Sequence, residues 1–292
     1  MVFLDPKSDI GFKKLFDNKK QPEIVISFLN SVLELKPGSL ITTITINDPS
    51  NLPNFNEGKY SLVDISCTDQ AGKNYIVEMQ VIDQKDYALR AQYYASLGIA
   101  NQLAKGSDYT TLKPVVFVGI VCFDLFKSTS YLSHHLILNK DTFEHGLELL
   151  TFHFIELPKF NKTLEELDGV VEKWVYLLKH ADEMKAVPRA LQKPIELEAA
   201  MEVLEQGNWS KKELLAYERY WDYLRTQRSR QVTALEKGME KGLEKGRKEG
   251  RHEGYLDAII QLLPVMDNRQ IAKTMHVPIE KVEALRKKVE PK

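Results

Sequence analysis

The chain has 292 residues, of which 43% are hydrophobic and 28% charged, and its formal net charge at pH 7 is -1. These values are ordinary for a globular protein with a core, and they exclude a disordered chain and a histone-like protein that coats DNA by bulk cationic attraction. No apolar run approaches the roughly 20 residues that span a bilayer, and acidic residues interrupt the first segment early, so we expect a cytoplasmic protein without a membrane partner.

The first 60 residues predict two amphipathic helices and a strand. Ser8 is the expected cap of a helix that begins DIGFKKLF, and Pro22 is expected to open a second helix through EIVISFLNSVL. The pattern then changes to ITTITI, a β-branched run that predicts a strand. A loop rich in Asn, Pro and Gly follows between Asn47 and Lys59.

The next segment predicts a β-hairpin, a helix and a buried strand. The runs YSLVDISCTD and KNYIVEMQVI are separated by the turn signal Asp69-Gln70-Ala71-Gly72. A helix is expected from about Asp86 to Lys105, with Gly106 as its stop signal. The continuous apolar run PVVFVGIVCF predicts a strand that is covered on both faces. The apolar residues of the expected helix recur near one face: Leu89, Tyr93, Leu97, Ala100 and Ala104.

The C-terminal half is expected to be helical after a short strand at about Phe152–Leu157. Glycines then recur every fourth residue in EKGMEKGLEKGRKEGRHEG, which predicts a marginal, exposed helix or a linker. We therefore expect a core at 1–155, a helical region at 156–232, and the repeat helix with a small helical tail at 233–292.

The tail itself has the outline of two short helices, at Asn268 to Met275 and from Pro278 onward, joined by a tight turn. This outline resembles a small helix-turn-helix, although such helix pairs are also common packing units.

Acidic residues inside the predicted hairpin are the chief chemical signal. Glu78 and Gln80 are two residues apart on one strand and so share a face, and Asp64 lies on the partner strand. Phosphodiester hydrolysis requires a divalent ion, and hard ions such as Mg²⁺ are held by carboxylate and carbonyl oxygens. The alternative interpretation is that these are outward-facing polar positions of a half-exposed hairpin.

Asp64 followed by Glu78-Met79-Gln80 resembles the PD-(D/E)XK nuclease motif, with Gln in place of the usual Lys. Together with SDIGFKKLF, ALRAQYYASLGIANQL and the glycine-repeat tail, these residues resemble the recombination-promoting nuclease and putative transposase family. The resemblance covers about the first 130 residues well and the tail loosely. Residues 156–232 match only in general character.

This resemblance implies an α/β fold, with a central mixed sheet flanked by helices and a restriction-endonuclease-like core. It also implies a DNA endonuclease that depends on Mg²⁺ (or Mn²⁺) and is associated with recombination or mobile elements. Asp64 and Glu78 would be direct metal ligands and the backbone carbonyl of Met79 a third. Gln80 stands at the catalytic lysine position, where a neutral amide donates hydrogen bonds but supplies no full charge.

A cation from another element is expected to replace the missing lysine. The candidates are Lys13 and Arg90, and we prefer Lys13 as the catalytic partner of phosphate or water; the alternative for Lys13 is a solvated side chain. Asp9 is either a further metal ligand or a capping residue of its helix. Arg90, Gln92 and Tyr94 are expected DNA contacts, although a helical tyrosine more often packs in the core.

A rival hypothesis from a different class is a noncatalytic DNA-binding or assembly protein that keeps this fold, and Gln80 is the feature that distinguishes the two. A double-strand cutter with one ion site per chain would need two chains or two cleavage events, and the first alternative raises a homodimer as a hypothesis. His134, His135, His145 and His153 lack compact metal-ligand spacing, so we expect no zinc site there. Cys67 and Cys122 are expected to be small core residues.

Overall fold

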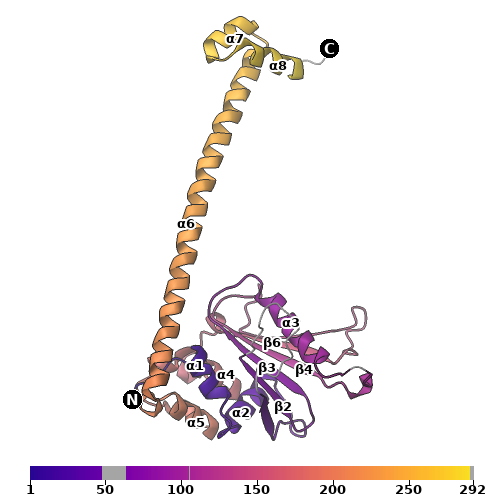
Figure 1. Ribbon diagram of the computed structural model, residues 1–292, viewed down its shortest axis with the longest axis vertical. Helices are drawn as coiled ribbons and strands as arrows, with labels where there is room; N and C mark the ends of the chain where they lie inside the picture. Colours follow the sequence, from indigo (N-terminus) through magenta and orange to yellow (C-terminus); the bar gives the residue numbers. More distant parts are fainter. Residues whose placement is uncertain (48–63, 105, 290–292) are drawn as a thin grey trace. The chain divides into compact units, whose positions relative to one another are not determined.

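The computed structural model describes residues 1–47, 64–104 and 106–289 (Figure 1). Most of the loop predicted between Asn47 and Lys59, and the first residues of the predicted hairpin, lie outside these ranges. The chain divides into two compact units, Met1–Leu224 and Arg225–Lys292.

The first unit is built on a six-stranded mixed sheet with the strand order β1-β2-β3-β4-β6-β5. At the centre of the sheet, β3, β4 and β6 run parallel to one another, whereas the β1–β2, β2–β3 and β5–β6 pairs are antiparallel. The predicted α/β architecture, a mixed sheet flanked by helices, is therefore confirmed. The strands are β1 Ile44–Asn47, β2 Ile65–Asp69, β3 Asn74–Gln80, β4 Val115–Val121, β5 Leu132–Leu136 and β6 Leu150–Glu156.

The predicted hairpin forms between β2 and β3. Its register pairs Ile65 with Val77, and the turn closes with a hydrogen bond of 3.0 Å from the Gly72 N–H to the Asp69 carbonyl. Gly72 has φ +80°, a left-handed conformation that suits glycine because it has no Cβ. The turn signal in the sequence thus fixed the register on which the placement of the acidic residues depends.

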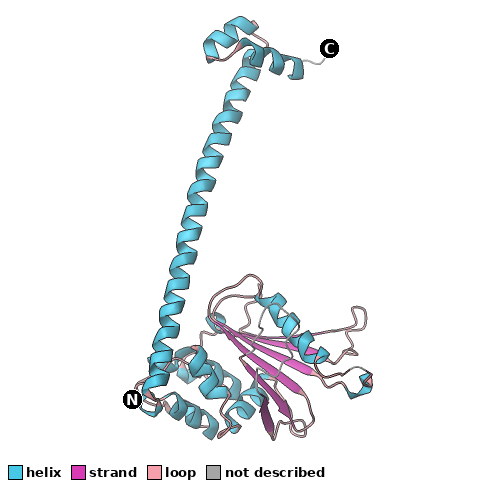
Figure 2. Cartoon of the chain, in the orientation of Figure 1, coloured by secondary structure: helices cyan, strands magenta, loops and turns pink. Residues whose placement is uncertain are grey.

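One face of the sheet is covered by four helices that share a single hydrophobic core (Figures 1 and 2). These helices are α1 Asp9–Phe16, α2 Glu23–Val32, α4 Val170–His180 and α5 Ile195–Leu204. Trp174 of α4 is completely buried and its ring lies 5.8 Å from that of Phe28 on α2. The helices after residue 156 therefore pack into the same core as the N-terminal helices.

The opposite face is covered by α3 Tyr87–Ala100 (Figure 1). The expected extension of this helix toward Lys105 was wrong, because α3 ends at Ala100. The predicted stripe also faces outward at its start, where Leu89 is 68% and Tyr93 55% exposed. Close packing on β4 is the reason, since small residues on the other face let the helix approach the strand. The buried residues of α3 are Tyr87, Ala91 and Ala95.

Helix α6, Lys211–Leu262, spans 52 residues. Its first turns belong to the first unit and pack against α1 and the segment that precedes it. Glu213 forms an ion pair of 2.7 Å with Lys14, and the Tyr217 hydroxyl accepts a hydrogen bond of 3.1 Å from the Asp5 N–H. Short 3-10 helices also occur in this unit: η2 Tyr109–Thr111, η3 Leu157–Lys159, η4 Leu164–Glu166, η5 Ala181–Glu183, η6 Arg189–Leu191 and η7 Gln206–Asn208.

In the second unit, the glycine repeat continues α6 as an exposed helix, in agreement with the prediction. Helices α7 Asn268–Met275 and α8 Ile279–Val289 then confirm the predicted pair of short helices. Within the described ranges, no helix is both long and apolar enough to span a membrane.

Candidate active site

The acidic residues of the motif meet where β2 begins and β3 ends. Glu78 lies on β3, and Asp64 directly precedes β2. The Asp64 carboxylate accepts a hydrogen bond of 2.9 Å from the Met79 N–H through Oδ2, so this aspartate is held against the strand that carries Glu78. The hairpin register therefore brings together two carboxylates from neighbouring strands.

Glu78 is 4% exposed, and its Oε2 atom is buried without a hydrogen-bond partner among the described residues. The nearest cation is the guanidinium of Arg90 on α3, whose Nη2 lies 4.0 Å from this oxygen. Burial raises the pKa of Glu78, the charge of Asp64 adds to this rise and Arg90 opposes it, so that the resulting pKa is about 8. Such a buried, unsatisfied carboxylate is costly in a purely structural role.

Asp64 has a smaller shift in the same direction. Burial raises its pKa, the hydrogen bond from Met79 lowers it and the charge of Asp9 raises it, with a resulting pKa of about 6. The charges of Lys13 and Arg90 also lower the pKa of Asp64. Side chains from α1 and α3 thus act on one carboxylate, which places the site between these two helices.

Helix α1 contributes Asp9 and Lys13 as an i,i+4 ion pair of 3.0 Å, with side chains 49% and 36% exposed. The side-chain cap of α1 is Ser8, whose Oγ accepts a hydrogen bond from the Gly11 N–H at 3.1 Å. A Cβ at Gly11 would lie 2.7 Å from that Oγ, so glycine is required by this close approach. The SDIG sequence therefore forms the tight entry that presents Asp9 and Lys13.

Gln80 points to the same side of β3 as Glu78. Its Nε2 donates to the Ile82 carbonyl at 2.8 Å, and its Oε1 lies 3.5 Å from Arg90 Nη2 as an acceptor. The guanidinium of Arg90 also lies over the rings of Tyr87 and Tyr94, 5.7 Å and 5.8 Å from their centroids. Arg90 is thus the cation beside Glu78 and Gln80, while Lys13 acts from the Asp64 side.

Tyr87 belongs to this cluster, although no motif in the sequence singles it out. Its completely buried hydroxyl has no hydrogen-bond partner within the described part of the chain. Burial raises its pKa, with further contributions from the charges of Glu78 and Asp64. Gly119, opposite Glu78 in the β3–β4 register, makes room for it, since a Cβ there would lie 2.7 Å from the hydroxyl. An isolated glycine inside PVVFVGIVCF was the available signal.

Tyr220 reaches the site from α6, more than 100 positions beyond the motif. Its hydroxyl donates to the Lys7 carbonyl at 3.4 Å. Burial raises the pKa of Tyr220, and the charges of Asp9 and Asp64 raise it further. No local sequence signal distinguishes Tyr220 from other aromatic residues of an amphipathic helix.

The other two residues that were expected to contact DNA, Tyr94 and Gln92, lie in different places. Tyr94 is half-buried beside Arg90. Gln92 is exposed, donates to the Ala88 carbonyl at 3.1 Å, and lines a separate cavity of about 250 Å³ with aromatic side chains of β5 and β6. The structure therefore brings only some of these three residues to the acidic cluster.

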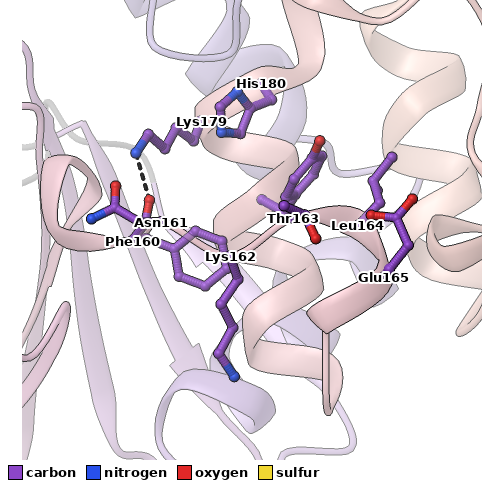
Figure 3. Close-up of a pocket in the computed structure, with 9 residues that line it drawn as sticks. Phe160, Asn161, Lys162, Thr163, Leu164, Glu165, Lys179 and His180 are labelled. Atoms are coloured by element: carbon purple, nitrogen blue, oxygen red, sulfur yellow. Dashed lines mark hydrogen bonds between the residues drawn. The ribbon is translucent and has the colours of Figure 1, made fainter.

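A further cavity of about 370 Å³ lies between α4 and the segment that precedes it (Figure 3). Its cations are already engaged, because Lys179 donates to the Phe160 carbonyl and Lys162 forms an ion pair with Glu172. None of its lining residues belongs to the acidic cluster.

The residues of the cluster fit a hard divalent cation. Two carboxylates converge, one of their oxygens is buried and unpartnered, and both pKa values are raised by burial. A group of three or more His, Cys, Asp or Glu side chains with metal-binding geometry does not occur among the described residues. Mg²⁺ commonly binds through one or two carboxylates and completes its shell with other oxygens.

Comparison with known families agrees with this geometry. The model of the family described as PD-(D/E)XK nuclease family transposase matches residues 6–233, which is most of the chain. The chain belongs to this family. No curated protein and no solved structure matches it. As a PD-(D/E)XK family member, the protein is nuclease-like or transposase-like, and nucleases of this superfamily typically use divalent metals. The matched segment contains α1, the β2–β3 hairpin, α3 and the first turns of α6.

Proposed function

We propose that this protein is a Mg²⁺-dependent DNA endonuclease that acts in recombination or on mobile elements, with Mn²⁺ as an alternative ion. The observation that carries the proposal is the buried carboxyl group of Glu78 next to Asp64, at the motif of a nuclease family, with one oxygen that has no hydrogen-bond partner among the described residues. A bound cation would offset the cost of ionising this buried carboxyl group, which is expected of a binding site more than of a folding core.

Asp64 and Glu78 would hold the metal ion, with the backbone carbonyl of Met79 as a third ligand and Asp9 as a further one. The bound ion would polarise a phosphoryl oxygen and lower the pKa of an attacking water. Support for the ligand set comes from the hydrogen bond between Asp64 and the Met79 N–H, and from the charge of Asp9 acting on Asp64.

The chain's own cations would take over the role of the missing lysine. Lys13 is our preferred phosphate or water partner because its side chain is 36% exposed and its charge acts on Asp64. Arg90 is held between Gln80 and Glu78, where it offsets the carboxylate charge and orients Gln80. In this arrangement Gln80 accepts a hydrogen bond from Arg90, and Arg90 supplies the positive charge that Gln80 lacks.

DNA would approach along the α3 side of the site, where Arg90, Gln92 and Tyr94 are the proposed contacts. The exposed side chains of Leu89 and Tyr93 on the same helix are consistent with a surface that is covered by a ligand. A homodimer would supply two such sites for double-strand cleavage.

The second candidate function is a noncatalytic DNA-binding or assembly protein. The observation that favours it is Gln80 at the lysine position, with its Nε2 already donating to the Ile82 carbonyl. In the endonuclease, Lys13 or Arg90 would supply the positive charge that the lysine of the motif normally provides. In the noncatalytic protein, neither residue would do so.

Incubation of the purified protein with supercoiled plasmid and Mg²⁺ separates these functions. Cleavage should require the ion, be abolished by EDTA, and be lost in Asp64→Ala and Glu78→Gln. Glu148→Gln is the matched control, because it removes one carboxylate from an exposed position of the same unit. Folding of each variant is verified by circular dichroism. Absence of nicking by the native chain across Mg²⁺, Mn²⁺ and salt concentrations would favour the noncatalytic function.

A further inference from the structure

The end of the second unit is a small helical module with its own core. The last turns of α6 pack against α7 and α8 through buried aliphatic side chains. The central residues of this core are Ile259, Leu263, Ile271 and Val282. The arrangement of α7 and α8 is therefore determined by contacts within the second unit.

The connection between α7 and α8 is a fixed turn. His276 ends α7 in the left-handed conformation, with φ 56° and ψ 46°, and the Val277 N–H donates to the Ala272 carbonyl at 3.0 Å. Asp267 and Gln270 form a capping box at the start of α7. Two short helices joined by three residues in this way have the layout of a helix-turn-helix.

Arg286 holds α8 in place from its inner side. Its guanidinium donates to the Leu263 carbonyl at 2.7 Å, to the Met266 carbonyl at 2.8 Å and to Asn268 Oδ1 at 2.7 Å. The Tyr255 hydroxyl similarly donates to the Met275 carbonyl at 3.0 Å. Arg286 therefore joins α8 to the end of α6 and the start of α7, while Lys287 and Lys288 on the outer face of α8 remain exposed to solvent.

The charge of the chain is divided unequally between the two units. Residues 225–292 contain 16 Lys and Arg against 10 Asp and Glu, a formal net charge of +6. The whole chain contains 40 and 41, so residues 1–224 contain 24 and 31, a formal net charge of -7. The net negative charge of the first unit therefore disfavours binding of a polyanion such as DNA. The excess of basic residues is concentrated in the second unit.

Basic residues also dominate the exposed surface of the helix pair. Five Lys or Arg side chains on α7 and α8 are exposed: Arg269, Lys273, Lys281, Lys287 and Lys288. Exposed large apolar residues near the pair are limited, within the described chain, to Val265 and Val289 at its two ends. This composition matches a phosphate backbone better than the apolar centre of a protein interface.

We propose that α7–α8 is a helix-turn-helix module that binds duplex DNA, with α8 as the helix that enters the major groove. Lys281 and Ala284, on exposed positions of the first turns of α8, would face base edges. Lys287 and Lys288 would contact phosphates, and α7 would cross the backbone with Arg269 and Lys273. This DNA-binding function is independent of cleavage, and it would hold a substrate that the acidic nuclease unit does not attract by itself.

The test measures binding of full-length protein to a labelled 25-bp duplex by fluorescence anisotropy. The Glu78→Gln background and EDTA prevent cleavage, so a failure of the proposed nuclease activity leaves this measurement intact. Lys287→Ala/Lys288→Ala is compared with Lys237→Ala/Lys241→Ala, which removes the same charge from exposed positions of α6. Titrations at several salt concentrations give the number of phosphates contacted.

The α8 double variant should weaken binding about 10-fold and reduce the salt slope by about 2, since each phosphate contact contributes about 0.9 to that slope. The α6 control should change binding less than about 3-fold. Ala284→Glu, an exposed substitution outside the core, should also reduce binding. Equal effects of the two double variants, or tighter binding of a 25-nucleotide RNA than of the duplex, would overturn the proposal.

Discussion

The substitution Glu78→Gln should change how the stability of the protein depends on pH. Glu78 has a raised pKa in the folded state, about 8, against 4.5 in the unfolded chain. The folded state therefore retains a proton that the unfolded state has lost, and the free energy of unfolding decreases as pH rises from 4.5 to about 8. Glutamine has nearly the same shape and carries no charge at either pH, so the variant lacks this decrease.

The magnitude follows from the shift. A change from 4.5 to about 8, at about 1.4 kcal/mol for each pH unit, corresponds to a loss of about 5 kcal/mol when Glu78 is fully ionised. At pH 5 wild type and variant should have similar stability, because the glutamate is protonated in the folded state. At pH 9 the variant should be more stable by an amount that approaches this figure.

Urea denaturation followed by tryptophan fluorescence, at pH 5, 7 and 9 in EDTA, measures the difference. Asp83→Asn is the control, because it removes an exposed carboxylate close to the hairpin. Parallel pH profiles for wild type and Glu78→Gln would refute the argument that burial raises the pKa of this carboxyl group. The same profile obtained with saturating Mg²⁺ should be flatter for the wild type, since the bound cation compensates the charge.

Three other predictions follow from the site and the repeat helix. Mg²⁺ affinity, measured by calorimetry in buffers of different ionisation heat, should increase between pH 6 and 8 with release of protons, because Glu78 must lose its proton to bind; a pH-independent affinity would contradict this. Gly119→Ala should destabilise the fold by about 1 to 3 kcal/mol, because the new Cβ would lie 2.7 Å from the Tyr87 hydroxyl, whereas Gly146→Ala meets no atom within 4 Å and should be nearly neutral in thermal denaturation. Gly238→Ala should stabilise the exposed part of α6 by up to about 1 kcal/mol, measured as increased helicity by circular dichroism, and no steric cost opposes it because the added Cβ is in open space.

Features that depend on neighbouring residues could be predicted from the sequence alone. The Ser8 cap, the Asp69–Gly72 turn and the helix pair at the C-terminus were all predicted and are all present. The β2–β3 hairpin also followed from local patterns, and its register brought the acids of the motif together. Local backbone chemistry sets these elements, so a short window of sequence contains the information needed.

Strand pairing across long loops could not be predicted in the same way. Strand β5 was not expected, yet it pairs with β6 and places His134 Nδ1 2.6 Å from His153 Nδ1. This contact could not be predicted from the positions of the two histidines along the chain, because strand pairing is decided by which strand edges are available in the folded sheet.

Tertiary packing also decided the environment of the acidic site. The sequence contained Asp64, Glu78 and Gln80, but only packing of α3 on β4 through small residues brought Arg90 to them. Only the docking of α6 brought Tyr220 into range of Asp64. Burial and electrostatic contact between distant segments depend on the whole fold, and they are what convert two ordinary carboxylates into groups with raised pKa values.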